Sequence, residues 1–304
     1  MSSPMRVLVT GVGGFLGGHL AQRLLDRGHT TIGTTWGTTS DLQRVELHEV
    51  DLLDAAGLSA VVRAANPEAI VHLAGLSHVG ESWQRPADYF QVNVLGTENV
   101  LDAAAGLSRC RVLLASSAEV YGLVPEDHQP IVESQPVAPR TPYALTKAAA
   151  ERLTVRAGGI VARCFNLVGP GQSNRFALPA FAAQLAAIKK GEQEPVLQVG
   201  NLSARRDFVH VSDGVAALAL LAEQGAPGEI YNVALGKAFS IAEALDRLIA
   251  ISGQKVEIQE DKERLRPVDM PLLEGDAGKL RALGWKPEKD LDAALGELWA
   301  AVAG

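Results

Sequence analysis

Tyr143 and Lys147 are the side chains in this sequence whose types and spacing best suit proton transfer. They stand four positions apart in a helix-forming stretch, which puts them on one face of a helix. A tyrosine hydroxyl has an ordinary pKa of about 10, too high for acid or base catalysis at neutral pH. Because a nearby ammonium stabilises the phenolate, Lys147 is expected to lower the pKa of Tyr143.

A second group of reactive side chains follows the apolar run 111–116. Ser117 and Glu119 come where this run ends. In a parallel sheet the carboxyl ends of the strands form the edge where ligands bind. We therefore expect Ser117 to hold a substrate oxygen, and Glu119 to act as a base or to bind a substrate hydroxyl. The alternative is that the serine hydroxyl only satisfies neighbouring backbone groups.

A glycine-rich turn predicts a dinucleotide site. Gly11, Gly14 and Gly17 directly follow an apolar run and open a helix. Glycine is needed where the chain bends sharply, where it approaches a pyrophosphate, and where the helix packs on the strand. Phe15 and Leu16, in the first turn of the helix, complete the predicted cradle. A dinucleotide cradle combined with a proton-transfer pair makes a redox enzyme the leading hypothesis.

The end of the second expected strand bears on the choice between NAD and NADP. NAD-selective sites place an acid there for the ribose 2′-hydroxyl, whereas NADP sites avoid the acid and often supply an arginine. Here the strand ends in Thr35 and Trp36, which are neither acidic nor basic. We expect NADP, with NAD as the alternative. Asp51 and Leu52 follow the third strand, where Asp51 either accepts a hydrogen bond from the adenine or caps a helix.

Short β-type runs alternate with helix-length segments in the first half of the chain, which predicts an α/β fold with a doubly wound parallel sheet. The expected strands are 6–10, 30–34, 45–50, 69–74, 111–116 and 160–165, and the expected helices are 15–27, 55–65, 87–105 and 143–156. Further helices are expected at 176–190, 213–223, 241–252 and 291–302. We expect residues 1–166 to be mainly an NAD(P)-binding Rossmann domain and 167–304 mainly a smaller substrate-binding lobe, with the chain crossing between the two.

The composition argues against several other classes of protein. A chain of 304 residues that is 47% hydrophobic can bury a large core, and its net charge of −7 disfavours nucleic acid as a partner. No apolar run is long enough to cross a membrane and no secretory leader is evident, so we expect a cytoplasmic protein with no membrane partner. Cys110 and Cys164 lack the spacing of a zinc site, so no metal is expected.

Together these motifs resemble the successive signatures of the extended short-chain dehydrogenase/reductase superfamily of nucleotide-sugar enzymes. The matching segments are 10–17, 51–52, 72–75, 93–97, 116–122, 143–147, 206–211 and 266–269. Within the superfamily, segments 77–83, 165–172, 199–208 and 265–267 look most like the GDP-4-keto-6-deoxy-D-mannose reductases and the related GDP-mannose 4,6-dehydratases. The length and segments 93–96, 169–172 and 284–287 agree better with the reductases. Ala118 also stands where many dehydratases carry an acid.

The resemblance implies roles for the matching residues. Ser117, Tyr143 and Lys147 would form the catalytic triad, with Glu119 retained beside it. Further cofactor contacts would come from Leu73, Ala74, Gly75 and Asn93, and substrate contacts from Ser77, Asn166, Asn201, Arg206, Arg266 and Asp269. Among these, the two arginines would bind a diphosphate, as their planar guanidinium groups suit, and the aspartate would face a ribose. The resemblance also implies a homodimer joined through a four-helix bundle.

The resemblance thus implies an enzyme that reduces the C4 ketone of GDP-4-keto-6-deoxy-D-mannose with NAD(P)H, giving GDP-D-rhamnose or its C4 epimer. A GDP-mannose 4,6-dehydratase or a nucleotide-sugar 4-epimerase would use the same residues with a tightly held, self-recycling cofactor. A non-catalytic nucleotide-binding regulator is a third alternative. The complete triad argues against it, since binding alone does not need that constellation.

Overall fold

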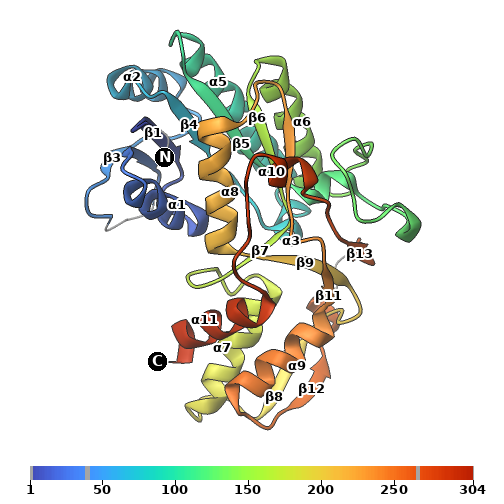
Figure 1. Ribbon diagram of the computed structural model, residues 1–304. Coiled ribbons are helices and arrows are strands. Elements are labelled where there is room, and N and C mark those ends of the chain that lie inside the picture. Colours follow the sequence, from blue (N-terminus) through green and yellow to red (C-terminus); the bar gives the residue numbers. More distant parts are fainter. Residues whose placement is uncertain (1–2, 38–41, 265–267, 304) are drawn as a thin grey trace.

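Seven parallel strands form the main sheet of the computed structural model, which describes residues 3–37, 42–264 and 268–303 (Figure 1). Their order across the sheet is β10-β6-β5-β4-β1-β2-β3. The strands are β1 (Arg6–Thr10), β2 (Thr30–Thr35), β3 (Glu46–Glu49), β4 (Ala69–His72), β5 (Arg111–Ser117), β6 (Ile160–Cys164) and β10 (Ile230–Val233). The predicted doubly wound parallel sheet is confirmed, and its first six strands lie within two residues of the expected limits.

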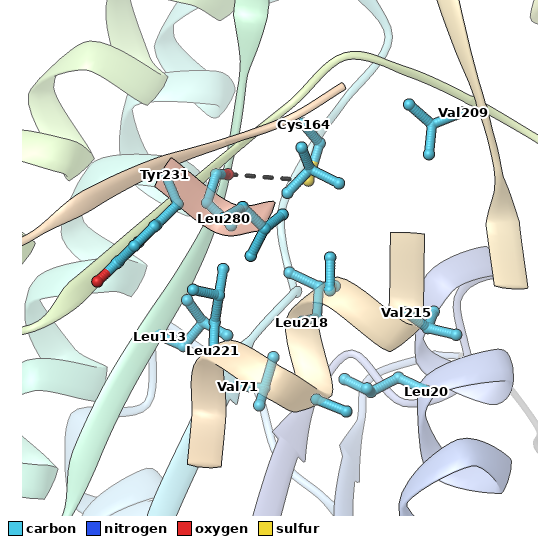
Figure 2. Packing of buried hydrophobic residues seen from close by; sticks show 14 of the residues in the cluster. Leu20, Val71, Leu113, Cys164, Val209, Val215, Leu218, Leu221, Tyr231 and Leu280 are labelled. Carbon is cyan, nitrogen blue, oxygen red and sulfur yellow. Dashed lines mark hydrogen bonds between the residues drawn. The ribbon is translucent and has the colours of Figure 1, made fainter. Parts of the chain in front are cut away.

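Helices cover both faces of this sheet. On one side lie α1 (Phe15–Asp26) and α8 (Val211–Gln224), and on the other lie α2 (Ala55–Ala65), α5 (Gly96–Ala105) and α6 (Pro142–Arg156). Figure 2 shows the packing on the first side, where Leu218 and Leu221 of α8 approach Val71 and Leu113 of the strands. Strands β1 and β4 read as nearly continuous apolar runs because both of their faces are buried, whereas the edge strand β3 is polar and largely exposed.

The expected single helix 87–105 is interrupted. The structure has α4 (Pro86–Phe90), a π-helical turn (Gln91–Leu95) and then α5. Asn93 lies within the π-helical turn, and its backbone carbonyl accepts a hydrogen bond from the hydroxyl of Thr97 at 2.6 Å. Such turns insert one extra residue into a helix and commonly occur at functional sites. The periodicity of the sequence does not reveal the interruption, because apolar residues continue on both sides of it.

The C-terminal part adds a second, smaller body. Three strands, β7 (Asn166–Val168), β11 (Ala238–Ser240) and β13 (Leu272–Leu273), join β9 (Arg205–His210) in a small sheet, and β8 (Val196–Val199) pairs with β12 (Glu257–Glu260). Helices α7 (Ala177–Lys189), α9 (Ile241–Ser252) and α11 (Leu291–Ala303) pack together around a separate apolar core. Short helices are α3 (Val79–Ser82), α10 (Gly278–Ala282), and three 3₁₀ turns at Ala118–Tyr121, Glu126–His128 and Lys262–Arg264.

The chain passes between the two bodies more than once. Although α8 and β10 come after residue 166, α8 covers the main sheet and β10 forms its edge, while α10 packs beside β10 (Figure 1). The expected helix 213–223 therefore belongs with the cofactor-binding half in space. No helix in the described ranges is long and apolar enough to cross a membrane.

Candidate active site

The end of β5 and the first turn of α6 hold the predicted catalytic residues. Thr141 caps α6 by accepting a hydrogen bond from the amide of Ala144 (Oγ1 to N, 3.1 Å), which places Tyr143 in the first turn. The hydroxyls of Tyr143 and Ser117 are hydrogen-bonded to each other. Lys147 lies one turn further along, and Tyr143 and Lys147 are 8% and 9% exposed. The structure thus brings the three residues of the predicted triad together.

Ser117 and Glu119 share a tight turn at the end of β5. The amide of Glu119 donates to the hydroxyl oxygen of Ser117 at 3.2 Å, so this serine satisfies a backbone group as well as contacting Tyr143. The Glu119 carboxylate lies close enough to raise the pKa of Tyr143. Between them, Ala118 is buried in the core and has no proton to donate.

Burial controls the protonation of Tyr143 and Lys147. Burial raises the pKa of Tyr143 and outweighs the hydrogen bond with Ser117, which acts in the opposite direction. It lowers the pKa of Lys147 to about 8. The expected net lowering of the pKa of Tyr143 is therefore wrong, because the cost of desolvating the phenolate dominates. At neutral pH Tyr143 carries its proton, which is the form required of a proton donor.

A buried ion pair lies beside the elements that carry the predicted triad. Glu151 and Arg163 are 2.7 Å apart (Oε2 to Nη2), and both side chains are 5% exposed. The hydroxyl of Ser116 donates to Glu151 at 2.5 Å, which ties the end of β5 to α6. The negative charge of Glu151 also favours the charged form of Lys147. The pair therefore orients the two elements that carry the triad.

The turn between β1 and α1 has the shape of a pyrophosphate cradle. Gly11 has φ +69°, and a Cβ there would lie 2.8 Å from the Cα of Ala74. A Cβ on Gly17 would lie 2.3 Å from the carbonyl oxygen of Gly11. Gly14 caps α1 without a side-chain hydrogen bond, and the first turn, with Phe15–Leu16, contains no acid. Its amides and the positive end of the helix are open to an anion, so the residues present fit a dinucleotide.

Asn93 holds the loop that faces this cradle. The predicted cofactor residues Leu73, Ala74 and Gly75 form that loop, directly after β4. The side-chain amide of Asn93 bonds to the backbone of Leu76 in both directions (Oδ1 to N, 2.8 Å; Nδ2 to O, 2.9 Å) and donates to Thr146 at 3.0 Å. Its place in the structure is therefore a supporting one, and direct contact with a cofactor stays a prediction.

The residues expected around the adenosine end lie at the ends of β2 and β3. Thr35 ends β2, and Trp36 follows it with 62% of its surface exposed. Leu52 is buried. The side chain of Asp51 accepts the amide two residues further on at 2.9 Å, whereas Asp54 caps α2. The alternative that Asp51 caps a helix is therefore wrong.

A cleft of about 690 Å³ separates α3 from the C-terminal body. Four predicted substrate residues line it, namely Asn166, Asn201, Arg206 and Asp269. Ser77 is exposed and does not line the cleft. Arg266 lies outside the described residues.

One wall of the cleft is a connected set of polar groups. Arg206 is 4% exposed and donates to Asp269 (Nη2 to Oδ1, 2.5 Å) and to the carbonyl of Met270 (Nη1 to O, 2.6 Å). Asn201 donates to the other oxygen of Asp269 at 2.9 Å. Three residues expected to contact different parts of a substrate therefore hold one another in position.

Sequence reasoning missed the opposite wall. His78 and Glu81 of the α3 segment face Arg175 and Phe176, which precede α7, and all four line the cleft. The segment 77–83 contributed to the resemblance without suggesting roles for these side chains. Arg175 belongs to no motif, so its only signal was a cation in the loop after the matched segment 165–172.

Comparisons with known proteins agree with this geometry. The profile of the family described as GDP-mannose 4,6 dehydratase matches residues 8–298. The GDP-6-deoxy-D-mannose reductase of Pseudomonas aeruginosa is 37% identical over 95% of this chain and 94% of its own length. These matches confirm the resemblance inferred from the motifs.

Solved structures show the same arrangement. The structure of RMD from Pseudomonas aeruginosa complexed with NADPH has a TM-score of 0.86 at 36% identity, covering 98% of this chain and 99% of that one. A Thermus thermophilus UDP-glucose 4-epimerase complexed with NAD has a TM-score of 0.90 at 29% identity, covering 99% of both chains. The chain therefore belongs to the GDP-mannose 4,6-dehydratase family, a group of NAD(P)-dependent nucleotide-sugar enzymes within the extended short-chain dehydrogenase/reductase superfamily.

Proposed function

We propose that this protein reduces the C4 ketone of GDP-4-keto-6-deoxy-D-mannose with NADPH, or with NADH, to GDP-D-rhamnose or its C4 epimer. The observation that carries the proposal is a buried Tyr143 beside Ser117, in a chain that also has an open pyrophosphate cradle. A ketone reduction needs a proton donor as well as a hydride donor. The similarity to a GDP-6-deoxy-D-mannose reductase supports the choice of substrate.

Each of the predicted site residues has a separate role in this reaction. When bound, the reduced nicotinamide supplies the hydride that attacks C4. Tyr143 donates its proton to the ketone oxygen, and Ser117 donates a hydrogen bond that holds this oxygen. Lys147 stabilises the phenolate that the proton transfer leaves behind, and Glu119 binds a substrate hydroxyl. We propose that the cradle at the start of α1 takes the pyrophosphate, that Thr35–Trp36 lie by the adenosine ribose, and that Asp51 and Leu52 contact the adenine.

The cleft is proposed to hold the nucleotide sugar. Asn166, at the start of β7, would contact the sugar, and Arg206 and Arg266 the diphosphate. Asp269 and Asn201 would bind the ribose. The polar wall supports this assignment, because groups that already hold one another lose little freedom when a ligand binds.

A 4-epimerase or a 4,6-dehydratase is the second candidate. Glu119 favours it, since its carboxylate lies near Tyr143, where these reactions use a base. Ala118 weighs against the dehydratase, because it leaves no acid to protonate a departing hydroxyl. Purified protein that retains NAD(P) through gel filtration and needs none added would favour this candidate.

The deciding experiment supplies freshly prepared GDP-4-keto-6-deoxy-D-mannose with NADPH or NADH. Loss of reduced-nicotinamide absorbance that matches the amount of deoxysugar product supports the reductase. Identification of the product by NMR gives the C4 configuration. No oxidation with either cofactor, together with conversion of GDP-mannose by the protein alone, would replace the reductase with the dehydratase.

We also propose a homodimer formed through α5 and α6. Phe90, Leu95 and Leu145 expose 46%, 51% and 46% of their surfaces near these adjacent helices. Exposed Asp102 on α5 and Arg152 on α6 provide opposite charges for a self-complementary contact. Light scattering of the unaltered protein should give twice the 32.1 kDa mass of the chain. The Leu145→Glu variant should have the mass of one chain and should still bind NADPH. A single mass for the unaltered protein would contradict the proposal.

A further inference from the structure

Three contacts join the α3 segment to the loop before α7 in the cleft wall that His78, Glu81, Arg175 and Phe176 form. Arg175 and Glu81 form an ion pair at 2.9 Å (Nη2 to Oε2). The ring of His78 is hydrogen-bonded to the carbonyl oxygen of Arg175 (Nε2 to O, 3.2 Å). It also packs edge-on against the ring of Phe176, with centroids 5.9 Å apart. Residues far apart in the sequence thus meet beside the space proposed for the substrate.

The backbone at Arg175 is fixed independently of its side chain. His78 accepts the amide of Glu81 on Nδ1 at 3.1 Å, so a neutral His78 carries its proton on Nε2 and donates it to the Arg175 carbonyl. The guanidinium pairs with Glu81, and the Arg175 side chain is 51% exposed. The side chain can therefore change partner while the loop that carries it stays in place.

Glu81 can release Arg175 without being left unpaired. It also accepts a hydrogen bond from Arg85 (Nη1 to Oε1, 3.1 Å) and lies 3.2 Å from the hydroxyl of Tyr89, which shares its one proton with the carbonyl oxygen of His78 at 2.7 Å. By contrast, Arg206 in the other wall is 4% exposed and bound to Asp269. Of these two cleft arginines, Arg175 is the one whose partner is replaceable.

We propose that the Arg175 guanidinium moves from Glu81 to the diphosphate of the nucleotide sugar. Glu81 binds this guanidinium until the substrate arrives. The inference rests on the proposed function, since it assumes that the cleft takes a nucleotide sugar. A planar guanidinium donates two parallel hydrogen bonds to phosphate oxygens as readily as to a carboxylate. Diphosphate therefore competes directly with Glu81 for the same donor.

Two substitutions of the ion pair have opposite expected effects. Arg175→Gln removes the ligand and should weaken GDP binding by about tenfold or more, the scale of a charge-assisted hydrogen bond. Glu81→Gln removes the competitor and should tighten GDP binding by about two- to fivefold, the scale of an exposed ion pair. Isothermal titration of the NADPH-loaded proteins with GDP measures both changes in affinity. In Arg175→Gln the loss of affinity should be smaller for GMP, which lacks the second phosphate, than for GDP.

Arg85→Gln is the matched control. Arg85 bonds to the same carboxylate and is as exposed as Arg175, but it does not line the cleft. Its removal should leave GDP affinity unchanged.

The outcomes separate this inference from the proposed function. Equal weakening in Arg175→Gln and Glu81→Gln would mean that the pair is only a structural clasp, and would overturn the inference. Unchanged GDP affinity in Arg175→Gln would overturn it too, while normal reduction by that variant would leave the proposed function standing. An unaltered protein that binds neither GDP nor UDP would overturn both.

Discussion

Tyr143 has two kinds of neighbour with opposite effects on its proton. Burial and the charge of Glu119 favour the neutral hydroxyl, while the hydrogen bond with Ser117 favours the phenolate. Burial has the largest effect, so the pKa of Tyr143 is raised and the neutral form is favoured. A residue held in this form suits proton donation, and therefore reduction of a ketone, better than it suits proton removal.

Tyr143→Phe should lower kcat by about 10² to 10⁴, the usual contribution of a positioned acid. The dissociation constant of NADPH should stay nearly constant, because the substitution removes only a hydroxyl. Steady-state kinetics and a fluorescence titration with NADPH measure the two effects. Tyr231→Phe is the control, since the Tyr231 hydroxyl contacts the backbone of Ala226, outside the triad. Full activity in Tyr143→Phe would contradict the mechanism.

Lys147 sets an upper pH limit on activity. Its pKa is lowered to about 8 by burial, so its positive charge is lost above that pH and kcat/KM should fall. The effect on stability has the opposite sign. Between about pH 8 and the ordinary value of 10.5 the unfolded chain binds the extra proton, so the contribution of Lys147 to the stability of the folded state increases as pH rises.

Lys147→Arg separates these effects, because a guanidinium keeps its charge throughout this range. Its kcat/KM should be lower than that of the unaltered protein but should not decline above pH 8. Rate profiles and urea unfolding from pH 6 to 10 give both readouts. An alkaline decline of the same size in the variant would assign it to another group.

Thr35→Asp should change the cofactor preference from NADPH toward NADH. A carboxylate at the end of β2 accepts a hydrogen bond from a ribose 2′-hydroxyl and repels a 2′-phosphate. We expect KM for NADPH to rise at least about tenfold, the scale of one charged interaction, with KM for NADH unchanged or lower. Thr35→Ser is the control for the loss of the native side chain. Equal changes for both cofactors would show that Thr35 does not face the ribose.

Sequence motifs located the side chains whose position depends on one element and missed those that depend on tertiary contacts. Tyr143 and Lys147 share a helix, so local spacing predicts their meeting, and the resemblance implied that Ser117, at the end of a strand, joins them. Arg175 reaches the cleft only because its loop folds against α3. The protonation of Tyr143 was missed for a similar reason, since burial comes from several elements and cannot be seen in a motif.

At the scale of elements, α1 combines a structural and a binding role in one turn. Its start must pass close to the carbonyl of Gly11 and still leave its first amides open. Glycine at position 17 makes the close approach possible. The neighbouring Gly18 has open space around it, so the two adjacent glycines meet different demands.

Gly17→Ala should weaken NADPH binding and destabilise the fold, because the new Cβ would lie 2.3 Å from the Gly11 carbonyl oxygen and displace the cradle. Gly18→Ala is its matched control. Nothing lies within 4 Å of a Cβ at that position, so the change should raise helix stability by roughly 0.5 to 1 kcal/mol. Urea unfolding and NADPH titration of both variants make the comparison. Equal NADPH affinities would refute the packing role of Gly17.

The elements themselves were predictable to different degrees. Strands buried on both faces form short apolar runs that stand out, and their order of alternation with helices gives a parallel sheet. The π-helical turn at Gln91–Leu95 left no comparable signal. Within it, Asn93 bonds to Leu76 and Thr146, two partners that only the folded chain brings near.

At the scale of the whole molecule, the repeated crossings should make the two bodies unfold together. Trp285 lies in the core of the main sheet and Trp299 packs against the second core. Trp299→Phe and Trp285→Phe therefore each leave a tryptophan reporter at only one of these two cores. NADPH at about a hundred times its dissociation constant should add about 2.7 kcal/mol to the unfolding free energy seen by either reporter.

Urea titration followed by tryptophan fluorescence tests this coupling, with circular dichroism as the reference for the whole chain. A Trp299 transition at lower urea that NADPH does not move would mean that the C-terminal body unfolds alone.

The return of α8 and β10 to the main sheet constrains how such a protein can acquire a new substrate. A single recombination point after residue 166 would exchange the cleft together with the sheet edge and one of its covering helices. Exchanging the C-terminal body alone would require replacing three separate segments, roughly 166–210, 238–273 and 291–303. Each segment would have to join the retained chain correctly at both of its ends. Divergence within this architecture therefore proceeds most easily by single substitutions in the cleft walls, while the cofactor half is inherited whole.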